Sequence, residues 1–317
     1  MNKRKQIYDF KDYFYIVNYP ENEKELCEME INSLFHKELN KKYLFSDKYI
    51  NPSRSPFIKH SISVIYKESS LNSIIDNIKK DKLFFNDFKI CYIKSEDLDV
   101  PYNDRLKSAK DIGFVITGFP NIHNPKIILG ISKVNNFWIF GIYEKNDYKW
   151  HSHDNKPNSY SNALSTKISR ALVNIAMEDN FNLKLVDPCC GVGTVVIEAL
   201  DLGFNVKGYE LSKPIAKNAR DNIEFFGYKR DIIKSFNMHD IKEDFDVCIL
   251  DIPYGLFSPI TEKEQVNLIK TARRITKKLV IVTFEDMDNI IRDCNFKIVN
   301  RCCVSKNNFK RYISICI

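Results

Sequence analysis

The chain has 317 residues, which is more than one compact domain usually holds, so we expect two domains with separate cores. Hydrophobic residues make up 44% and charged residues 28%, with only ten Gly and eleven Pro, and this composition excludes a largely disordered chain. The net charge of +7 permits a polyanionic partner, and no apolar run approaches the roughly 20 residues of a membrane span.

The start of the chain, MNKRKQIYDF, has no apolar signal-peptide core, so we expect a soluble protein located in the cytoplasm, without membrane association. The nine Cys form no C-x-x-C pair, which favours reduced thiols over a disulfide framework. His151 and His153 form an H-S-H pair, but no Cys pair lies near them in sequence, so no metal site is predicted.

The first half of the chain mixes strands and helices. One helical stripe is formed by Leu71, Ile74, Ile75 and Ile78, and a second stripe lies within residues 106–112. Strand-like runs occupy residues 13–18, 61–67, 87–93, 126–131 and 136–143. These elements predict a small α+β domain over residues 1–155. The polar, turn-rich residues 151–161 are the best candidate for a linker.

The second half, residues 156–317, alternates strands and helices, which is typical of a layered α/β domain. A helix is expected over residues 162–177, and another over residues 212–227, where Ile215, Ala219 and Ile223 form a stripe. The predicted strands are residues 183–187, 205–210, 231–236, 246–251, 279–284, 296–302 and 310–316. The last two are joined by so short a connection that they must be antiparallel neighbours.

The densest motif is LKLVDPCCGVGTVVIEAL at residues 183–200, where a strand ends in Asp187 and a glycine turn leads into an apolar helix. Gly191 and Gly193 let the backbone approach a ligand at the start of that helix. A simple tight turn would explain the glycines alone, but not the acid and the flanking pattern together. The third small residue of a dinucleotide loop is replaced by Val196, and a Gly-Lys-Ser/Thr ending is absent. Because Asp187 would repel a pyrophosphate, the motif favours cationic S-adenosylmethionine.

Two further acids follow the next two strands. Glu210 ends the second strand, where a carboxylate can accept hydrogen bonds from ribose hydroxyls, although a solvent-exposed Glu is the simpler alternative. Asp240 follows the third strand, and its carboxylate can accept a hydrogen bond from the adenine amino group. Both residues are predicted to bind the cofactor.

The fourth predicted strand runs into Asp251, Ile252, Pro253, Tyr254 and Gly255. An exocyclic amine on a base is a poor nucleophile, so catalysis needs acceptors that hold its N–H groups. The Asp251 carboxylate and the Pro253 carbonyl can do this, and Tyr254 can stack on the base. A plain Pro-Gly turn is the alternative, but the position after the fourth strand favours a catalytic role for all three residues.

These motifs resemble the THUMP-containing tRNA guanosine-N2 methyltransferases, a family of the putative RNA methylase class with a Rossmann-like fold. DPCCGVGTVVIEAL is similar to the family's D-P-x-x-G-x-G-T…E-A loop, DIPYG to its D-P-P-Y-G motif, and residues 156–176 to its lead-in segment. The resemblance implies a sheet of order 3-2-1-4-5-7-6 with strand seven antiparallel. It also implies that Pro188, Cys190 and Thr194 belong to the cofactor loop. Ile252 departs from the first Pro of the motif, which weakens any assignment of the methylated base.

Residues 112–132 are similar to the end of a THUMP domain, so the resemblance implies that the N-terminal domain binds RNA. Its basic and aromatic residues could contact RNA, or they could simply end an amphipathic helix. These residues are Lys79, Lys80, Lys82, Phe84 and Phe85.

The sequence therefore predicts a methyltransferase that uses S-adenosylmethionine and acts on an exocyclic amine of RNA, foremost guanosine N2 in tRNA. A DNA methyltransferase acting on adenine N6 or cytosine N4 is the alternative enzyme. A non-catalytic RNA-binding protein that retains the fold is the alternative of another class. In-line transfer from sulfonium to nitrogen requires neither a metal nor a covalent Cys.

Overall fold

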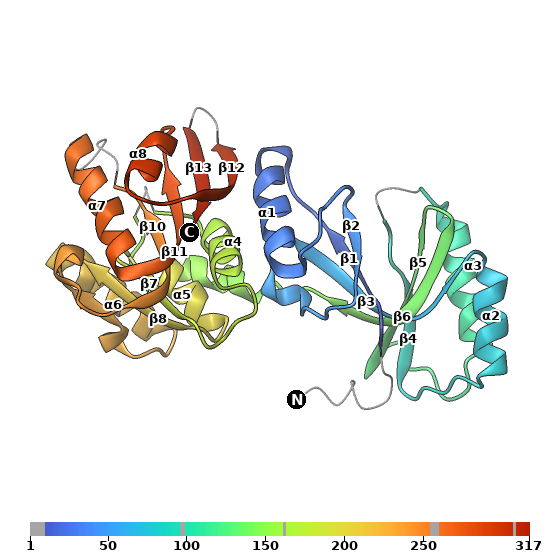
Figure 1. Ribbon diagram of the computed structural model, residues 1–317. Coiled ribbons are helices and arrows are strands. Elements are labelled where there is room, and N and C mark those ends of the chain that lie inside the picture. The colour runs from blue at the N-terminus through green and yellow to red at the C-terminus, as the bar shows by residue number, and fades with distance from the viewer. Residues whose placement is uncertain (1–9, 96–98, 161–162, 254–259, 307–308) are drawn as a thin grey trace. The chain divides into compact units, whose positions relative to one another are not determined.

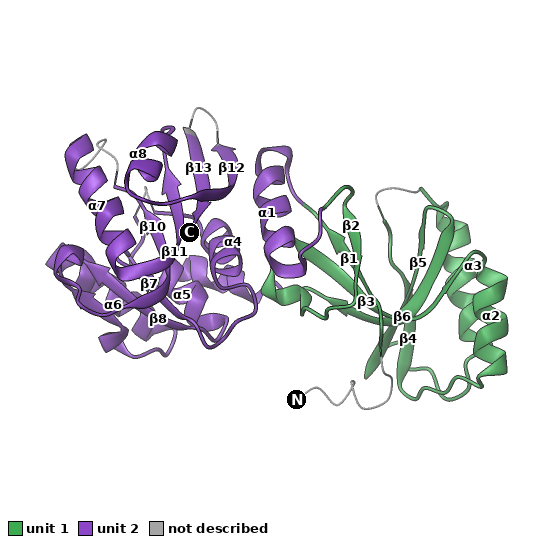
Figure 2. Cartoon of the chain, viewed as in Figure 1, with its two compact units in different colours: residues 1–18, 39–147 green, residues 19–38, 148–317 purple. Residues whose placement is uncertain are grey.

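The computed structural model describes residues 10–95, 99–160, 163–253, 260–306 and 309–317. The chain forms two compact units, shown in different colours in Figure 2. Unit 1 comprises residues 1–18 and 39–147, and unit 2 comprises residues 19–38 and 148–317. No helix within the described ranges is long and apolar enough to span a membrane.

Unit 1 is built on a six-stranded sheet of order β2-β1-β3-β6-β5-β4. Its strands are β1 (Tyr13–Val17), β2 (Tyr43–Ser46), β3 (Ile58–Glu68), β4 (Phe88–Tyr92), β5 (Ile127–Val134) and β6 (Phe137–Lys145). Neighbours are antiparallel except β4 and β5. The helices α2 (Leu71–Lys80) and α3 (Tyr102–Gly113) pack on this sheet, as Figure 1 shows, through a core that includes Ile74, Ile78, Ile112 and Phe140. The predicted α+β composition of this half is confirmed.

The basic and aromatic residues proposed to contact RNA in this unit do not all reach the surface. Lys79, Lys80, Lys82 and Phe84 are exposed. Phe85 is only 4% exposed and packs in the hydrophobic core. Stacking of Phe85 on RNA, one of the two alternatives that the sequence left open, is therefore excluded, because the segment turns Phe85 inward.

Unit 2 is built on a seven-stranded sheet of order β12-β13-β11-β10-β7-β8-β9. Its strands are β7 (Lys184–Asp187), β8 (Asn205–Glu210), β9 (Ile233–Ser235), β10 (Phe245–Asp251), β11 (Thr276–Thr283), β12 (Ile298–Lys306) and β13 (Phe309–Cys316). Numbered from β7, this order is 3-2-1-4-5-7-6. The pairs among β7 to β11 are parallel, whereas β13 is antiparallel to both β11 and β12. The predicted Rossmann-like methyltransferase sheet and its C-terminal hairpin are confirmed.

Helices cover both faces of the unit 2 sheet (Figure 1). One face carries α7 (Glu262–Ile275) and α8 (Asp288–Asp293), which share a core with β10 and β11. The other elements are α4 (Thr166–Met177), α5 (Thr194–Asp201) and α6 (Lys213–Phe225). Helix α4 begins four residues later than predicted, because the Ser165 side chain accepts a hydrogen bond from the amide of Ile168 and caps the helix there.

Helix α1 (Lys24–Phe35) lies within unit 2, although the sequence prediction assigned residues 1–155 to a single N-terminal domain. Buried Glu30 accepts a hydrogen bond from the Asn174 amide on α4 across 2.6 Å. Met29 contacts Cys302 on β12, with 3.7 Å between the sulfur atoms. The chain therefore leaves unit 1 after residue 18, contributes a helix to unit 2 and returns.

The segment predicted as a linker is partly ordered structure. Residues Lys149–Asn155 form a 3-10 helix, η4, in which Trp150 and His153 are buried. The prediction of a linker over residues 151–161 is thus wrong for its first five residues. Its composition is polar, but Trp150 is buried and His153 bonds to the buried Glu198 on α5.

Candidate active site

Three acids meet at the carboxyl edge of the unit 2 sheet, because three adjacent parallel strands end there. Asp187 ends β7, Glu210 ends β8 and Asp251 ends β10. Strand β7 pairs with both neighbours, through Asp187 with Gly208 and Val186 with Cys248. The predicted acids of the first, second and fourth strands therefore lie at one place in the fold.

The loop after β7 is held by backbone hydrogen bonds, one to β8 and one within the loop. The amide of Cys190 donates to the carbonyl of Tyr209 across 2.9 Å, and the amide of Gly193 donates to the carbonyl of Cys190 across 2.8 Å. Pro188 is buried in this turn. Gly193 has a φ of 84° and precedes α5, so its backbone conformation favours glycine.

Gly191 differs from Gly193 in what surrounds it. Its φ of 53° lies in the left-handed region, and a Cβ added there would meet no atom within 4 Å. A Cβ on Gly193 would lie 3.1 Å from the Ile233 side chain. Gly191 is therefore the position where the loop backbone faces open space and can be approached by a ligand.

Glu210 is tied to the same loop. One carboxylate oxygen accepts a hydrogen bond from the Gly191 amide across 3.1 Å, and the other accepts from the Ser212 amide across 2.8 Å. The residue is half-buried. Its carboxylate thus fixes the glycine turn and the entry into α6 while part of it remains accessible.

The two acids of the central strands have unusual acidities. Burial raises the pKa of Asp187 well above its usual value, and the negative charges of Asp251 and Glu210 raise it further, whereas a hydrogen bond from the Cys189 amide at 3.3 Å lowers it. Burial also raises the pKa of Asp251 to about 7, against the opposing attraction of Arg311. A site with these acids favours a cationic ligand, which would stabilise the ionised carboxylates.

Two buried side-chain oxygens at this edge have no hydrogen-bond partner within the described part of the chain. They are Oδ1 of Asp251 and Oγ1 of Thr194, the first residue of α5. Because a buried polar atom without a partner costs free energy, such atoms mark places where a ligand can supply the missing bond. Together with the open space beside Gly191, they fit a polar ligand that lies along the loop and reaches Asp251.

Three predicted residues remain, and the structure describes two of them, Pro253 and Asp240. The carbonyl of Pro253 accepts a hydrogen bond from Gln265 Nε2 on α7 across 3.2 Å. Asp240 lies on the 3-10 helix η6 (Met238–Asp240) and is exposed. Tyr254, the predicted stacking residue, lies outside the described residues.

Asn222 is a supporting residue that the sequence analysis did not identify. It is fully buried on α6, and its Nδ2 donates to the carbonyl of Val192 in the glycine loop at 2.9 Å and to that of Asn158 at 2.8 Å. Its Oδ1 accepts from the Asn158 amide at 2.8 Å. The sequence feature that could have identified Asn222 is its position next to Ile223, in the apolar stripe that Ile223 forms with Ala219.

A buried ion cluster supports the helix that follows the loop. Glu198 on α5 is fully buried and accepts from Arg170 on α4 at 2.7 Å and from His153 at 2.5 Å. Arg170 also pairs with Asp201 at 2.8 Å. His153, Glu198 and Asp201 lie close enough together to share a cation, but the Arg170 guanidinium already occupies this cluster. The cluster thus links η4, α4 and α5.

Comparison with known proteins agrees with this geometry. Residues 154–287 match the model of the family UPF0020, described as the RMKL-like methyltransferase domain. A tRNA (guanine(10)-N2)-dimethyltransferase of Pyrococcus abyssi is 26% identical over 197 residues, which cover 57% of this chain and 58% of that protein. The protein of the same name from Methanocaldococcus jannaschii is 24% identical over 266 residues, covering 71% and 74% of the two chains.

Among solved structures, TrmN from Thermus thermophilus aligns with a TM-score of 0.47 and 12% identity over 96% of this chain and 99% of its own. The alignment with the Pyrococcus abyssi protein spans less than two thirds of that relative. The family match, however, covers the glycine loop and all three acids of the strand edge. The part of the chain that carries the candidate site is therefore similar to the RMKL-like methyltransferase domain.

Proposed function

We propose that this protein transfers a methyl group from S-adenosylmethionine to an exocyclic amine of an RNA base, with guanosine N2 of tRNA as the target. The observation that carries the proposal is Asp251. Its carboxylate ends the fourth strand of a methyltransferase sheet, beside the glycine loop, with one buried oxygen left to accept a hydrogen bond.

The residues of the loop fit the cofactor. The open space at Gly191 would allow the backbone to approach it, and Thr194 Oγ1 offers a hydroxyl for it at the start of α5. Asp187 would balance the positive charge of its amino-acid end, Glu210 would accept from its ribose hydroxyls, and Asp240 from its adenine amino group. Pro188, Cys190 and Gly193 would shape the loop around it. The cofactor, when bound, supplies an electrophilic methyl group.

Asp251 would hold and deprotonate the target amine. An ionised carboxylate accepts an N–H hydrogen bond, which keeps the amine in place with its lone pair free for the methyl group. Once the nitrogen has formed its new bond to carbon it carries an excess proton, which the carboxylate can take. A carboxylate with a pKa of about 7 is well matched to this task near neutral pH.

Pro253 and Tyr254 would complete the binding of the base. The Pro253 carbonyl already accepts from Gln265, and its second lone pair can accept the other N–H of the amine. Stacking by Tyr254 remains a prediction. The two relatives described above are named for the N2 position of a tRNA guanine, which supports guanosine N2 over the other exocyclic amines.

The test is to incubate the purified protein with labelled S-adenosylmethionine and unmodified tRNA, and to analyse the nucleosides by mass spectrometry. We expect N2-methylguanosine, with Asp251→Asn as the inactive control. Methylation of duplex DNA in preference to tRNA would replace this proposal by the DNA methyltransferase alternative. Failure to bind S-adenosylmethionine, measured by calorimetry, would favour a non-catalytic RNA-binding protein.

A further inference from the structure

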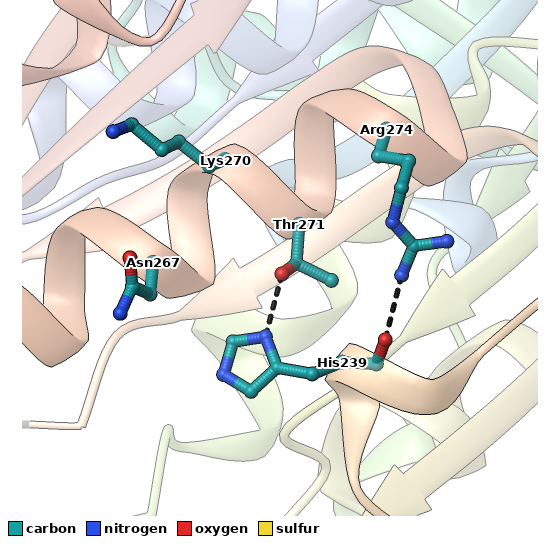
Figure 3. Close-up of a pocket in the computed structure, with 5 residues that line it drawn as sticks. All are labelled: His239, Asn267, Lys270, Thr271 and Arg274. Carbon is teal, nitrogen blue, oxygen red and sulfur yellow. Dashed lines mark hydrogen bonds between the residues drawn. The ribbon is translucent and has the colours of Figure 1, made fainter.

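A shallow hollow of about 340 Å³ lies on unit 2 where η6 meets α7. Its lining residues are His239, Asn267, Lys270, Thr271 and Arg274 (Figure 3). Two of these side chains are cations, and each of the other three carries a polar group that can donate a hydrogen bond. No carboxylate is among these lining residues. This chemistry fits an anion.

The hollow is held in shape by hydrogen bonds between its two walls. Arg274 donates from one nitrogen to the carbonyl of Ile241 at 2.7 Å and from another to the carbonyl of His239 at 2.9 Å. His239 Nδ1 lies 2.6 Å from the Thr271 hydroxyl (Figure 3). A guanidinium has five N–H donors, so these two bonds leave donors for a ligand.

The cations on this part of α7 are not neutralised. Lys270, Arg273 and Arg274 are exposed and lie on one helix face, at positions i, i+3 and i+4. In the described structure none of the three has a carboxylate within 4.0 Å, whereas Arg230 and Arg301 of the same unit each pair with two carboxylates. Cations in a last turn can be explained by the helix dipole, but Lys270 lies before that turn.

A second hollow nearby has a different character. Its charged lining residues are the cations Lys184, Arg273, Arg274 and Lys277 and the acids Asp244 and Asp246. Its mixed charge does not favour an anion, so the inference concerns only the hollow drawn in Figure 3.

We propose that the hollow formed by His239, Asn267, Lys270, Thr271 and Arg274 binds a backbone phosphate of the RNA strand that carries the target base. Helix α7 contacts the segment after Asp251 through the hydrogen bond from Gln265 to the Pro253 carbonyl, and Lys270 lies five residues further along the helix. That is roughly 7.5 Å along the helix axis. At about 3.4 Å per stacked nucleotide, a strand spans this length within a few nucleotides of the target base. The inference rests on the proposed RNA substrate.

The test compares matched charge changes at two exposed lysines of unit 2, Lys270 in the hollow and Lys229 outside it. Lys270→Gln, Lys270→Glu, Lys229→Gln and Lys229→Glu would be titrated with unmodified tRNA by fluorescence anisotropy over a series of salt concentrations. We expect Lys270→Gln to weaken tRNA binding roughly two- to fivefold, and Lys270→Glu to weaken it more. The slope of log K against log salt should fall by about 1 for Lys270→Gln. Lys270→Arg should restore both values.

Three results would overturn the inference in distinguishable ways. If the Lys270 and Lys229 variants have equal effects while the wild-type protein binds and methylates tRNA, the phosphate site is contradicted and the proposed function is not. If the wild-type protein binds no RNA, the phosphate site and the proposed function are both contradicted. An effect of Lys270→Gln on duplex DNA binding that exceeds its effect on tRNA would assign the hollow to DNA. Calorimetry with S-adenosylmethionine should give unchanged affinity for every Lys270 variant.

Discussion

The backbone amide of Gly191 donates a hydrogen bond to the carboxylate of Glu210 across 3.1 Å. The acid predicted to hold the ribose is therefore also the residue that sets the conformation of the glycine turn. Loss of its carboxylate should affect the loop and the ligand at once.

Replacement of Glu210 by Ala should weaken S-adenosylmethionine binding roughly 10- to 100-fold. Hydrogen bonds to a charged group contribute about 1.5–3 kcal/mol, and the variant loses both the loop bond and those to the ribose. Calorimetry with the purified variant measures this. The control is Glu243→Ala, which removes an acid paired with Lys207 on β8 at 2.6 Å. Wild-type affinity in Glu210→Ala would contradict the assignment.

Asp251→Asn should lower kcat by about 10²- to 10³-fold and change the affinity for S-adenosylmethionine far less, because the carboxylate acts on the amine of the substrate. Single-turnover methylation of tRNA separates these effects. A variant with normal turnover would show that the carboxylate neither holds nor deprotonates the amine.

The rate of the wild-type enzyme should depend on the ionisation of Asp251. Since its pKa in the free protein is raised to about 7 and the reaction requires the carboxylate, kcat/KM should rise tenfold per pH unit below pH 7 and level off above it. The folded state binds this proton more tightly than the unfolded state, so Asp251 lowers the free energy of unfolding as pH rises from about 4 to 7. Above pH 7, Asp251→Asn should therefore be more stable than wild type in urea unfolding. Equal stability at pH 8 would argue against a raised pKa.

Gly191→Ala and Gly193→Ala should separate binding from folding. Both residues have positive φ, so each substitution strains the backbone by about 1–2 kcal/mol. The new methyl group on Gly193 also meets Ile233 and should cost further stability, whereas on Gly191 it projects into open space. We expect the larger loss of cofactor affinity for Gly191→Ala and the larger loss of stability for Gly193→Ala. Paired denaturation and calorimetry measurements test this, and the reverse order would exclude the open face of Gly191 as the ligand side.

Asn222→Ala should destabilise the domain by about 1–3 kcal/mol, because it leaves the buried carbonyl of Val192 and the backbone of Asn158 without their partner. Cofactor affinity should fall as well, since Val192 belongs to the glycine loop. Asn218→Ala is the matched control, because only the backbone carbonyl of Asn218 bonds to Asn158. Similar urea midpoints for the two variants would mean that the hydrogen bonds of Asn222 to Val192 and Asn158 do not stabilise the loop.

Cys190→Ala should retain kcat within about twofold. Burial raises the pKa of the Cys190 thiol well above its usual value, so no thiolate is available near neutral pH. The thiol is also unnecessary for direct transfer between sulfonium and nitrogen. A large loss of turnover in a variant with normal folding and cofactor affinity would require a chemical role for this Cys.

Local patterns were sufficient for much of the unit 2 sheet. Apolar strand-like runs, a glycine turn after Asp187 and a short C-terminal connection predicted the strands, the antiparallel hairpin and the positions of Asp187, Glu210 and Asp251 at strand ends. The strand order, by contrast, was implied by the resemblance of the motifs to a known family, and the structure has that order. The acids themselves are identified by their positions at strand ends. Their roles are proposals that the experiments above address.

Tertiary structure alone decided the features that depend on distant partners. Residues 24–35 join unit 2 through Glu30 and Asn174, which are 144 positions apart, and no local pattern specifies such a pair. The same holds for the Asn222 bridge, which spans 64 and 30 positions, and for the inward turn of Phe85. The sequence by itself determined the strands and the acids at their ends, since these follow from local periodicity, whereas the strand order came from the resemblance of its motifs to a known family. Only the folded chain decided which polar groups are buried together, and burial is the physical cause of the raised pKa values at Asp187 and Asp251.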